Sequence, residues 1–130
     1  MAVVNVQFKG DMLFEAKAGK HTLKVDVPAA MGGKDRGMNP TELFASSLAT
    51  CVSVLVVAYC KDMKIDPAGL TVDLTYDKLD KPSRLANFKA AIHIPAGGWE
   101  KHKDGILRAA ERCPVHETIR MHEGLELTVS

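Results

Sequence analysis

Apolar and polar residues alternate along the first part of the chain. Val4, Val6 and Phe8 are separated by polar residues, and the same period of two returns in residues 13–19 and 21–27. A period of two is typical of a strand with one buried face. Because the turns between these segments are short, the pattern predicts three antiparallel strands.

The pattern changes after a glycine-rich loop, where residues 40–62 read as one long helix. Asn39 suits the N-cap, Pro40 suits the first helical position, and Glu42 completes the spacing of a capping box. Residues 43–59 are apolar or small around nearly the whole circumference. A helix of this kind is buried on all sides. One sheet can cover only one side, so we expect another long helix or a second subunit to cover the rest.

The second half of the chain returns to alternation and then becomes helical again. It predicts five further elements: strands at 70–79 and 84–94, helices at 99–112 and 113–120, and a strand at 125–129. This order, with no repeats or linkers, predicts a single α+β domain spanning residues 1–130. In it, an antiparallel sheet packs against the long central helix and a second helix.

Composition and charge exclude few functions. The net charge is +1, with 46% hydrophobic and 25% charged residues, which gives no reason to expect a nucleic-acid or membrane partner. The start of the chain lacks the basic and uniformly apolar regions of a signal peptide. The apolar segment 43–59 is at the short limit for crossing a bilayer, so a buried helix is the better interpretation. We therefore expect a cytoplasmic protein.

The chain contains three cysteines, Cys51, Cys60 and Cys113. Cys51 and Cys60 lie nine residues apart on the predicted helix, on opposite faces and about 13 Å apart along its axis, so they cannot pair. Cys60 is interpreted as a packing residue. Cys113 would begin a helix, where the helix dipole stabilises a thiolate. Cys51 lies about three turns inside its helix and would need a nearby cation, unless it only packs in the core.

The histidines offer no complete metal site. Cys113 and His116 have half of a zinc-ligand spacing, but no second pair follows at a suitable distance. His116 is either an exposed helical residue or a neighbour of the Cys113 thiol. We predict no metal and no organic cofactor.

The segment "NPTELFASSLATC", followed 62 residues after its cysteine by "CPV", resembles the OsmC/Ohr family of osmotically inducible and organic hydroperoxide resistance proteins. In that family, an Asn-Pro helix start leads to a reactive cysteine twelve residues after the asparagine, the distance from Asn39 to Cys51. Cys113 stands at the place of the second cysteine. "GGKD" ahead of the helix is similar to the OsmC-like branch of YhfA-type proteins.

This resemblance implies an OsmC/Ohr-like fold and a thiol-dependent peroxidase acting in oxidative stress defence. Cys51 would attack an organic hydroperoxide as a thiolate and become a sulfenic acid. Cys113 would resolve the sulfenic acid to a disulfide, and an external dithiol would reduce that disulfide. The family also implies an intertwined homodimer with its sites at the subunit interface.

One departure from the family pattern concerns activation of the thiol. In peroxidatic members a glutamate follows Asn-Pro directly and acts with an arginine, but Thr41 occupies that position here. The acid comes one residue later, at Glu42, about 180° around the helix from Cys51, where it serves the helix start better than catalysis. Arg36, in the preceding loop, is the candidate for the activating cation, or else a solvated loop residue.

Three functions remain open at this level. The first is the hydroperoxide reductase with Cys51 as the attacking thiol and Cys113 as the resolving thiol. The second is a binding or redox-sensing protein with little turnover, which holds a small apolar molecule in an interfacial pocket. The third is a dimeric protein whose cysteines only pack. The distance between the Cys51 and Cys113 sulfurs separates the first function from the third.

Overall fold

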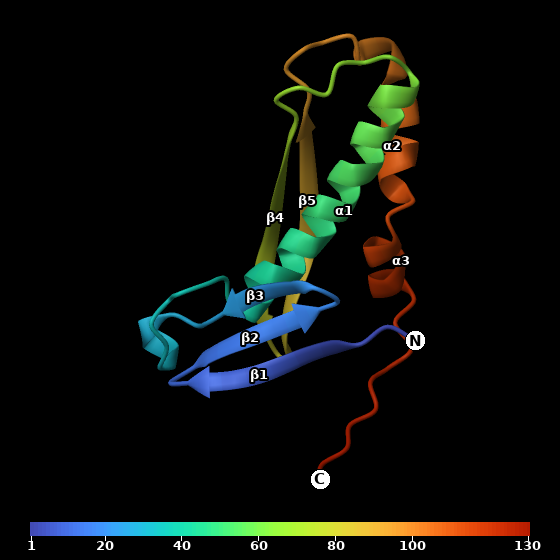
Figure 1. Ribbon diagram of the computed structural model, residues 1–130. Coiled ribbons are helices and arrows are strands. Elements are labelled where there is room, and N and C mark those ends of the chain that lie inside the picture. Colours follow the sequence, from blue (N-terminus) through green and yellow to red (C-terminus); the bar gives the residue numbers. More distant parts are fainter. The chain divides into compact units, whose positions relative to one another are not determined.

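The computed structural model describes all 130 residues and contains two compact units, Met1–Ala45 and Ser46–Ser130. The boundary falls inside the long helix α1 (Pro40–Asp62), which belongs to both units (Figure 1). Antiparallel strands and three α-helices confirm the predicted α+β class. That the chain is one domain stays a prediction.

The N-terminal unit contains a three-stranded antiparallel sheet in the order β1-β2-β3. Its strands are β1 (Val4–Gly10), β2 (Leu13–Ala18) and β3 (His21–Val25). They coincide with the three alternating segments of the sequence, which confirms the prediction. A short 3₁₀ helix, η1 (Ala29–Met31), and a loop then lead into α1. The apolar side chains of β1 remain exposed in the single chain.

Helix α1 begins with the capping box that the sequence predicts. The backbone N–H of Asn39 donates to Glu42 Oε1 at 3.1 Å, and the N–H of Glu42 donates to Asn39 Oδ1 at 2.9 Å. Each contact satisfies a backbone donor that the first helical turn leaves without a partner. The observed bounds, Pro40–Asp62, match the predicted ones.

In the C-terminal unit, helices pack against a two-stranded antiparallel sheet. The elements after α1 are β4 (Thr71–Asp80), β5 (Ser83–His93), η2 (Glu100–His102), α2 (Lys103–Glu111) and α3 (Pro114–Arg120). The predicted helix at 99–112 is thus divided into a 3₁₀ turn and an α-helix. The core forms where one face of α1 meets β5 and α2, and its members include Leu48, Val52, Val56, Ile94 and Ile106.

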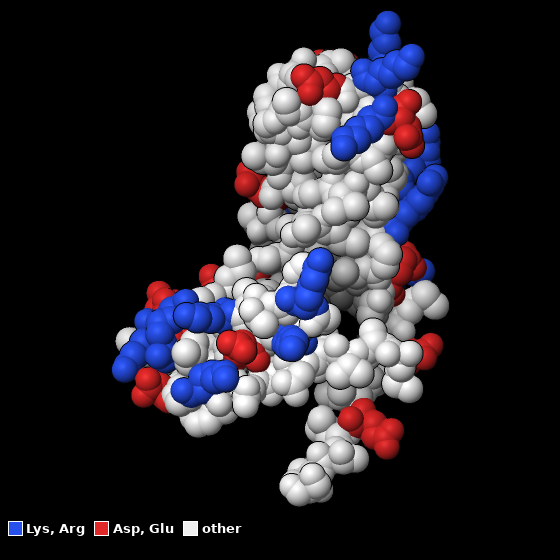
Figure 2. Space-filling model, in the orientation of Figure 1, with Lys and Arg blue, Asp and Glu red and all other residues white.

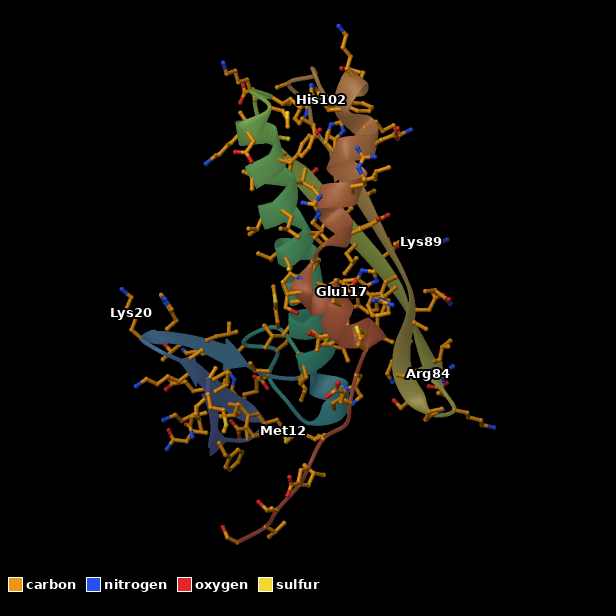
Figure 3. The ribbon with its side chains drawn as sticks, turned by 90° about the vertical axis from the view of Figure 1, so that its right-hand side faces the viewer. Met12, Lys20, Arg84, Lys89, His102 and Glu117 are labelled. Atoms are coloured by element: carbon orange, nitrogen blue, oxygen red, sulfur yellow. The ribbon has the colours of Figure 1, made fainter.

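A glycine sets the close approach of α1 and α2 within this unit. A Cβ atom at Gly105 would overlap the hydroxyl group of Tyr59, so a larger residue here would force the Tyr59 ring to move. The Tyr59 hydroxyl lies 3.3 Å from Nδ1 of His102, and the two rings meet edge to face. Figure 3 shows His102 at the end where α1 finishes and α2 begins. These contacts fix the two helices side by side.

One predicted strand is absent from the single chain, and the burial of α1 by a second subunit stays a prediction. Residues 125–129 form no strand, because no other strand of this chain pairs with them, and Leu127 is 81% exposed. Helix α1 is also not buried on all sides: Thr50, Val54 and Ala58 lie on an exposed face, with Val54 60% exposed. The hydrophobic pattern predicts which faces of an element can be buried. The rest of this chain does not cover the apolar faces of residues 125–129 and of α1.

Candidate functional site

The two cysteines that the sequence singles out meet in the C-terminal unit. Cys51 on α1 and Cys113 at the start of α3 lie within hydrogen-bonding reach, although 62 residues separate them in the chain. Both are free thiols. Cys113 is fully buried in the core, whereas Cys51 is half-buried at its edge. One thiol of the pair is therefore open to a reagent and the other is held behind it.

The surroundings of Cys113 keep its proton in place. Burial raises the pKa of Cys113, and the hydrogen bond to Cys51 and the negative charge that Cys51 can carry raise it further. The backbone N–H of His116 donates to Sγ at 3.4 Å and opposes this effect, as expected for a cysteine that caps a helix. The sequence led us to expect a thiolate stabilised by the helix dipole. The helix start does favour the thiolate through these backbone N–H groups, but burial outweighs it and the pKa is raised overall.

Cys60 is a core residue. It is fully buried between apolar side chains at the far end of α1, and burial raises the pKa of its thiol. A neutral, inaccessible thiol is a poor nucleophile. The packing interpretation of Cys60 is confirmed.

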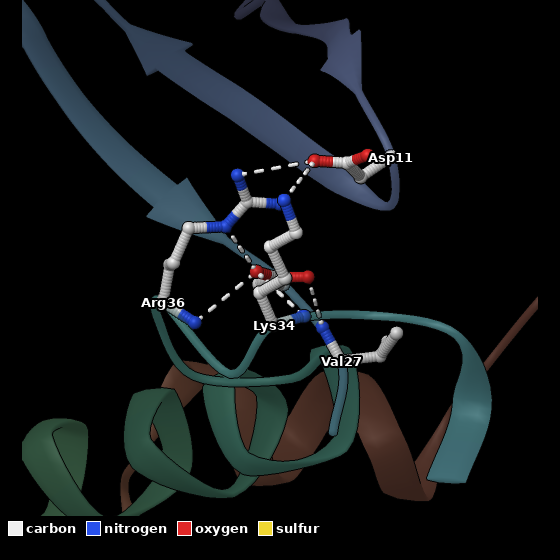
Figure 4. A network of polar contacts seen from close by, with 5 residues as sticks. Asp11, Val27, Lys34 and Arg36 are labelled. Atoms are coloured by element: carbon white, nitrogen blue, oxygen red, sulfur yellow. Dashed lines mark hydrogen bonds and ion pairs between the residues drawn. The ribbon is translucent and has the colours of Figure 1, made fainter. Parts of the chain in front are cut away.

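Arg36 is held by two carboxylates within the N-terminal unit, as Figure 4 shows. Its Nε donates to Asp26 Oδ2 at 2.7 Å, and its Nη1 lies 3.5 Å from Asp11 Oδ2. Lys34 makes a further ion pair with Asp11 at 3.2 Å. Arg36 is therefore not a freely solvated loop cation, and its guanidinium charge is already balanced. Its role in activating Cys51 stays a prediction.

Sequence reasoning missed Asp26, the acid at the centre of this network. It is fully buried, and it accepts hydrogen bonds from the N–H groups of Val27 at 2.8 Å and Arg36 at 3.1 Å. The side chain of Arg36 lowers the pKa of Asp26 from 3.8 to about 2, and these backbone donors add to the effect against the cost of burial. The sequence feature that could have indicated a buried ion pair is the position of Asp26 between two valines, shortly before a loop that contains Lys34 and Arg36.

Thr41 and Glu42 both serve the helix start. The Thr41 hydroxyl donates to Asn39 Oδ1 at 2.8 Å, and Glu42 is engaged in the capping box. These contacts confirm the structural interpretation of Glu42. Thr41 gives no charge to the site and holds the asparagine that caps the helix.

Residues 32–129 match the family model described as OsmC-like protein. The chain belongs to the OsmC-like family. A search of curated proteins found no match to it. Among solved structures, this OsmC-like chain is similar to one from Psychrobacter arcticus, described as an osmotic stress induced and detoxification response protein. The two are 28% identical over 95% of this chain and 90% of the other, with a TM-score of 0.82.

Two further solved structures share the fold of this OsmC-like protein at lower identity. The organic hydroperoxide resistance protein OsmC of Legionella pneumophila is 21% identical, with 92% and 89% of the two chains covered and a TM-score of 0.63. The organic hydroperoxide resistance protein OhrB of Bacillus subtilis is 20% identical, with 92% of both chains covered and a TM-score of 0.61. The OsmC/Ohr-like fold is thereby confirmed.

The OsmC-like chain has no group of three or more His, Cys, Asp or Glu side chains that could hold a metal ion. His116 approaches Cys113 only through its backbone N–H. Helix α1 is long and apolar enough to cross a membrane by length and composition alone, a test that the core helix of a soluble protein also passes. The site thus consists of two thiols at the edge of an apolar core.

Proposed function

We propose that this OsmC-like protein is a thiol-dependent peroxidase that reduces organic hydroperoxides, with Cys51 as the attacking thiol and Cys113 as the resolving thiol. The observation that carries the proposal is that these two thiols lie within hydrogen-bonding reach of each other and differ in exposure. Membership of the OsmC-like family and the fold shared with organic hydroperoxide resistance proteins support it. An arrangement that only packed two cysteines would not require this pairing.

The proposed chemistry has three balanced steps. The Cys51 thiolate attacks the distal oxygen of the hydroperoxide, an S–O bond forms, the O–O bond breaks, and the alkoxide takes up a proton to leave as an alcohol. Cys113 then attacks the Cys51 sulfenic acid, an S–S bond forms, and the hydroxyl leaves as water with the Cys113 proton. An external dithiol returns two electrons and reduces the disulfide. No cofactor is needed for this cycle.

The different surroundings of the two thiols suit these different roles. The Cys113 thiol keeps its proton because of burial and its contact with Cys51, so it can donate that proton to the Cys51 sulfur. A donor beside a sulfur favours negative charge on it. The half-exposed Cys51 is then the member of the pair that a peroxide can reach. The apolar neighbours favour an alkyl hydroperoxide over a strongly hydrated one.

Treatment with cumene hydroperoxide in the absence of reductant is expected to remove two of the three free thiols. Cys51 and Cys113 are within reach of each other and should form one disulfide within the chain, whereas the buried Cys60 should stay reduced. Thiol titration under denaturing conditions, with peptide mapping of the disulfide, measures this result. A chain that retains all three thiols, or that links Cys60 instead, contradicts the proposed function.

We further propose that the protein acts as a homodimer in the cytoplasm, where dithiol reductants are present. The support is a face of α1 in the C-terminal unit that is uncharged except for Lys61 near the end of the helix, and Figure 2 shows a largely uncharged surface over this unit. Thr50, Ser53, Val54, Val57, Ala58 and Lys61 line a shallow pocket of about 410 Å³ on this helix. Small side chains let a second helix approach closely, and a second copy would cover the apolar residues that one chain leaves in water.

Val54→Lys is expected to shift the protein from dimer to monomer. Val54 is among the most exposed apolar residues of α1, and a lysine there would bury a charge in any contact between two such faces. Sedimentation equilibrium of wild type and variant over a range of concentrations measures the effect. A monomeric wild type, or a variant that dimerises as well as wild type, would remove this α1 face from the proposal.

A further inference from the structure

A second pocket in the C-terminal unit lies apart from the two paired cysteines. It has a volume of about 270 Å³ and opens between the end of β5 and the start of α2. Neither Cys51 nor Cys113 contributes to its lining. Helix α2 rises about 12 Å from Lys103 to its last residue, Glu111, and Cys113 comes after that end. The proposed peroxidase chemistry therefore does not use this pocket.

Most of the residues that line the pocket are apolar. Ile94 and Ile106 are buried members of the core, and they meet in the pocket with Ile92 of the sheet. Trp99 packs against the same core and gives a large flat surface. Leu107, which is 45% exposed, lies where the pocket reaches solvent. Because buried core residues form part of its wall, the pocket is present without a ligand.

The charge of the pocket lining is positive only. Lys103 is the one lining residue with a permanent charge, His93 is the only other lining residue that can become charged, and no carboxylate is present. Lys103 also takes part in none of the ion pairs of the protein. It is the first residue of α2, so the positive end of a helix adds to its field. An apolar pocket with one cation at its edge suits a ligand with one negative charge.

We infer that this pocket binds a small monocarboxylic acid with an apolar body. The carboxylate pairs with the Lys103 ammonium, whose flexible stem can follow it, and the hydrocarbon lies against Trp99 and the isoleucines. The volume is slightly below the range of roughly 300–1,000 Å³ that is usual for small-molecule sites. A compact acid of medium chain length fits this volume, and a long-chain lipid does not.

The only tryptophan of the chain makes the inference directly measurable. Because Trp99 lines the pocket, octanoate is expected to change the tryptophan fluorescence in a saturable manner. Lys103→Met should weaken octanoate binding on the order of tenfold by removing a charge-assisted contact at a partly exposed site, and should leave the affinity for 1-octanol unchanged. The measurement uses neither peroxide nor reductant, so its outcome is independent of the thiol chemistry.

Two variants complete the test. Lys101→Met removes an equal charge from the neighbouring turn η2, outside the pocket lining, and should bind octanoate like wild type. Ala90→Phe places a ring into the pocket from an exposed strand position and should abolish binding without disturbing the core. The inference is overturned if octanoate causes no saturable change in wild type. It is also overturned if Lys101→Met weakens binding as much as Lys103→Met, or if octanol binds as tightly as octanoate.

Discussion

Cys51→Ser is expected to lower the dithiol-dependent turnover of cumene hydroperoxide to the uncatalysed background, because a serine hydroxyl supplies no thiolate. Cys113→Ser is expected to behave differently. It keeps the attacking sulfur but loses the resolving thiol, so it should consume about one equivalent of peroxide and then stop or slow. The Cys51 sulfenic acid should accumulate in this variant and oxidise further when peroxide is in excess. Peroxide consumption and intact-protein mass measure both results.

Cys60→Ala is the matched control for these variants. It removes a thiol from the same helix, but a thiol that lies in the core and away from solvent. Its turnover should equal that of wild type, with a modest loss of stability from the smaller side chain. If Cys51→Ser retained the activity of wild type, or if Cys60→Ala lost it, Cys51 would not be the attacking residue.

The distribution of apolar residues was sufficient to predict most of the fold. Alternation located the five observed strands, and the capping residues located the start of α1, since both signals act within a few neighbouring residues. The strand predicted at 125–129 does not form within the chain. Its alternation indicates a surface that can pair, but a strand also needs a partner edge, which no local pattern identifies.

The candidate site was predictable only in part. The family pattern singled out Cys51 and Cys113, but only tertiary packing brings two thiols 62 residues apart into contact. The same packing buries Cys113 and reverses the effect expected from its place at a helix start. Asp26 was missed for a related reason: a lone acid just after a strand gives no sign that it will be buried with a cation.

Asp26→Asn is expected to lower the midpoint of thermal unfolding on the order of 10 °C. Asp26 is fully buried and holds the loop after β3 through the side chain and backbone of Arg36, and an uncharged amide cannot balance the guanidinium. Asp35→Asn is the matched control: it makes the same change in the same loop at an exposed residue whose φ of 53° asparagine tolerates. The control should unfold close to the temperature of wild type.

The dependence of this difference on pH tests the charge of Asp26 directly. Its pKa in the folded protein is about 2, below its ordinary value of 3.8, so its carboxylate stabilises the fold fully above about pH 4. This contribution is lost as the pH falls from about 4 to about 2, because the folded protein must then bind the proton. Thermal unfolding of wild type and Asp26→Asn should therefore converge across that interval, since protonated aspartate resembles asparagine. A gap that stays constant down to pH 2 would show that the size of the side chain, not its charge, holds the loop.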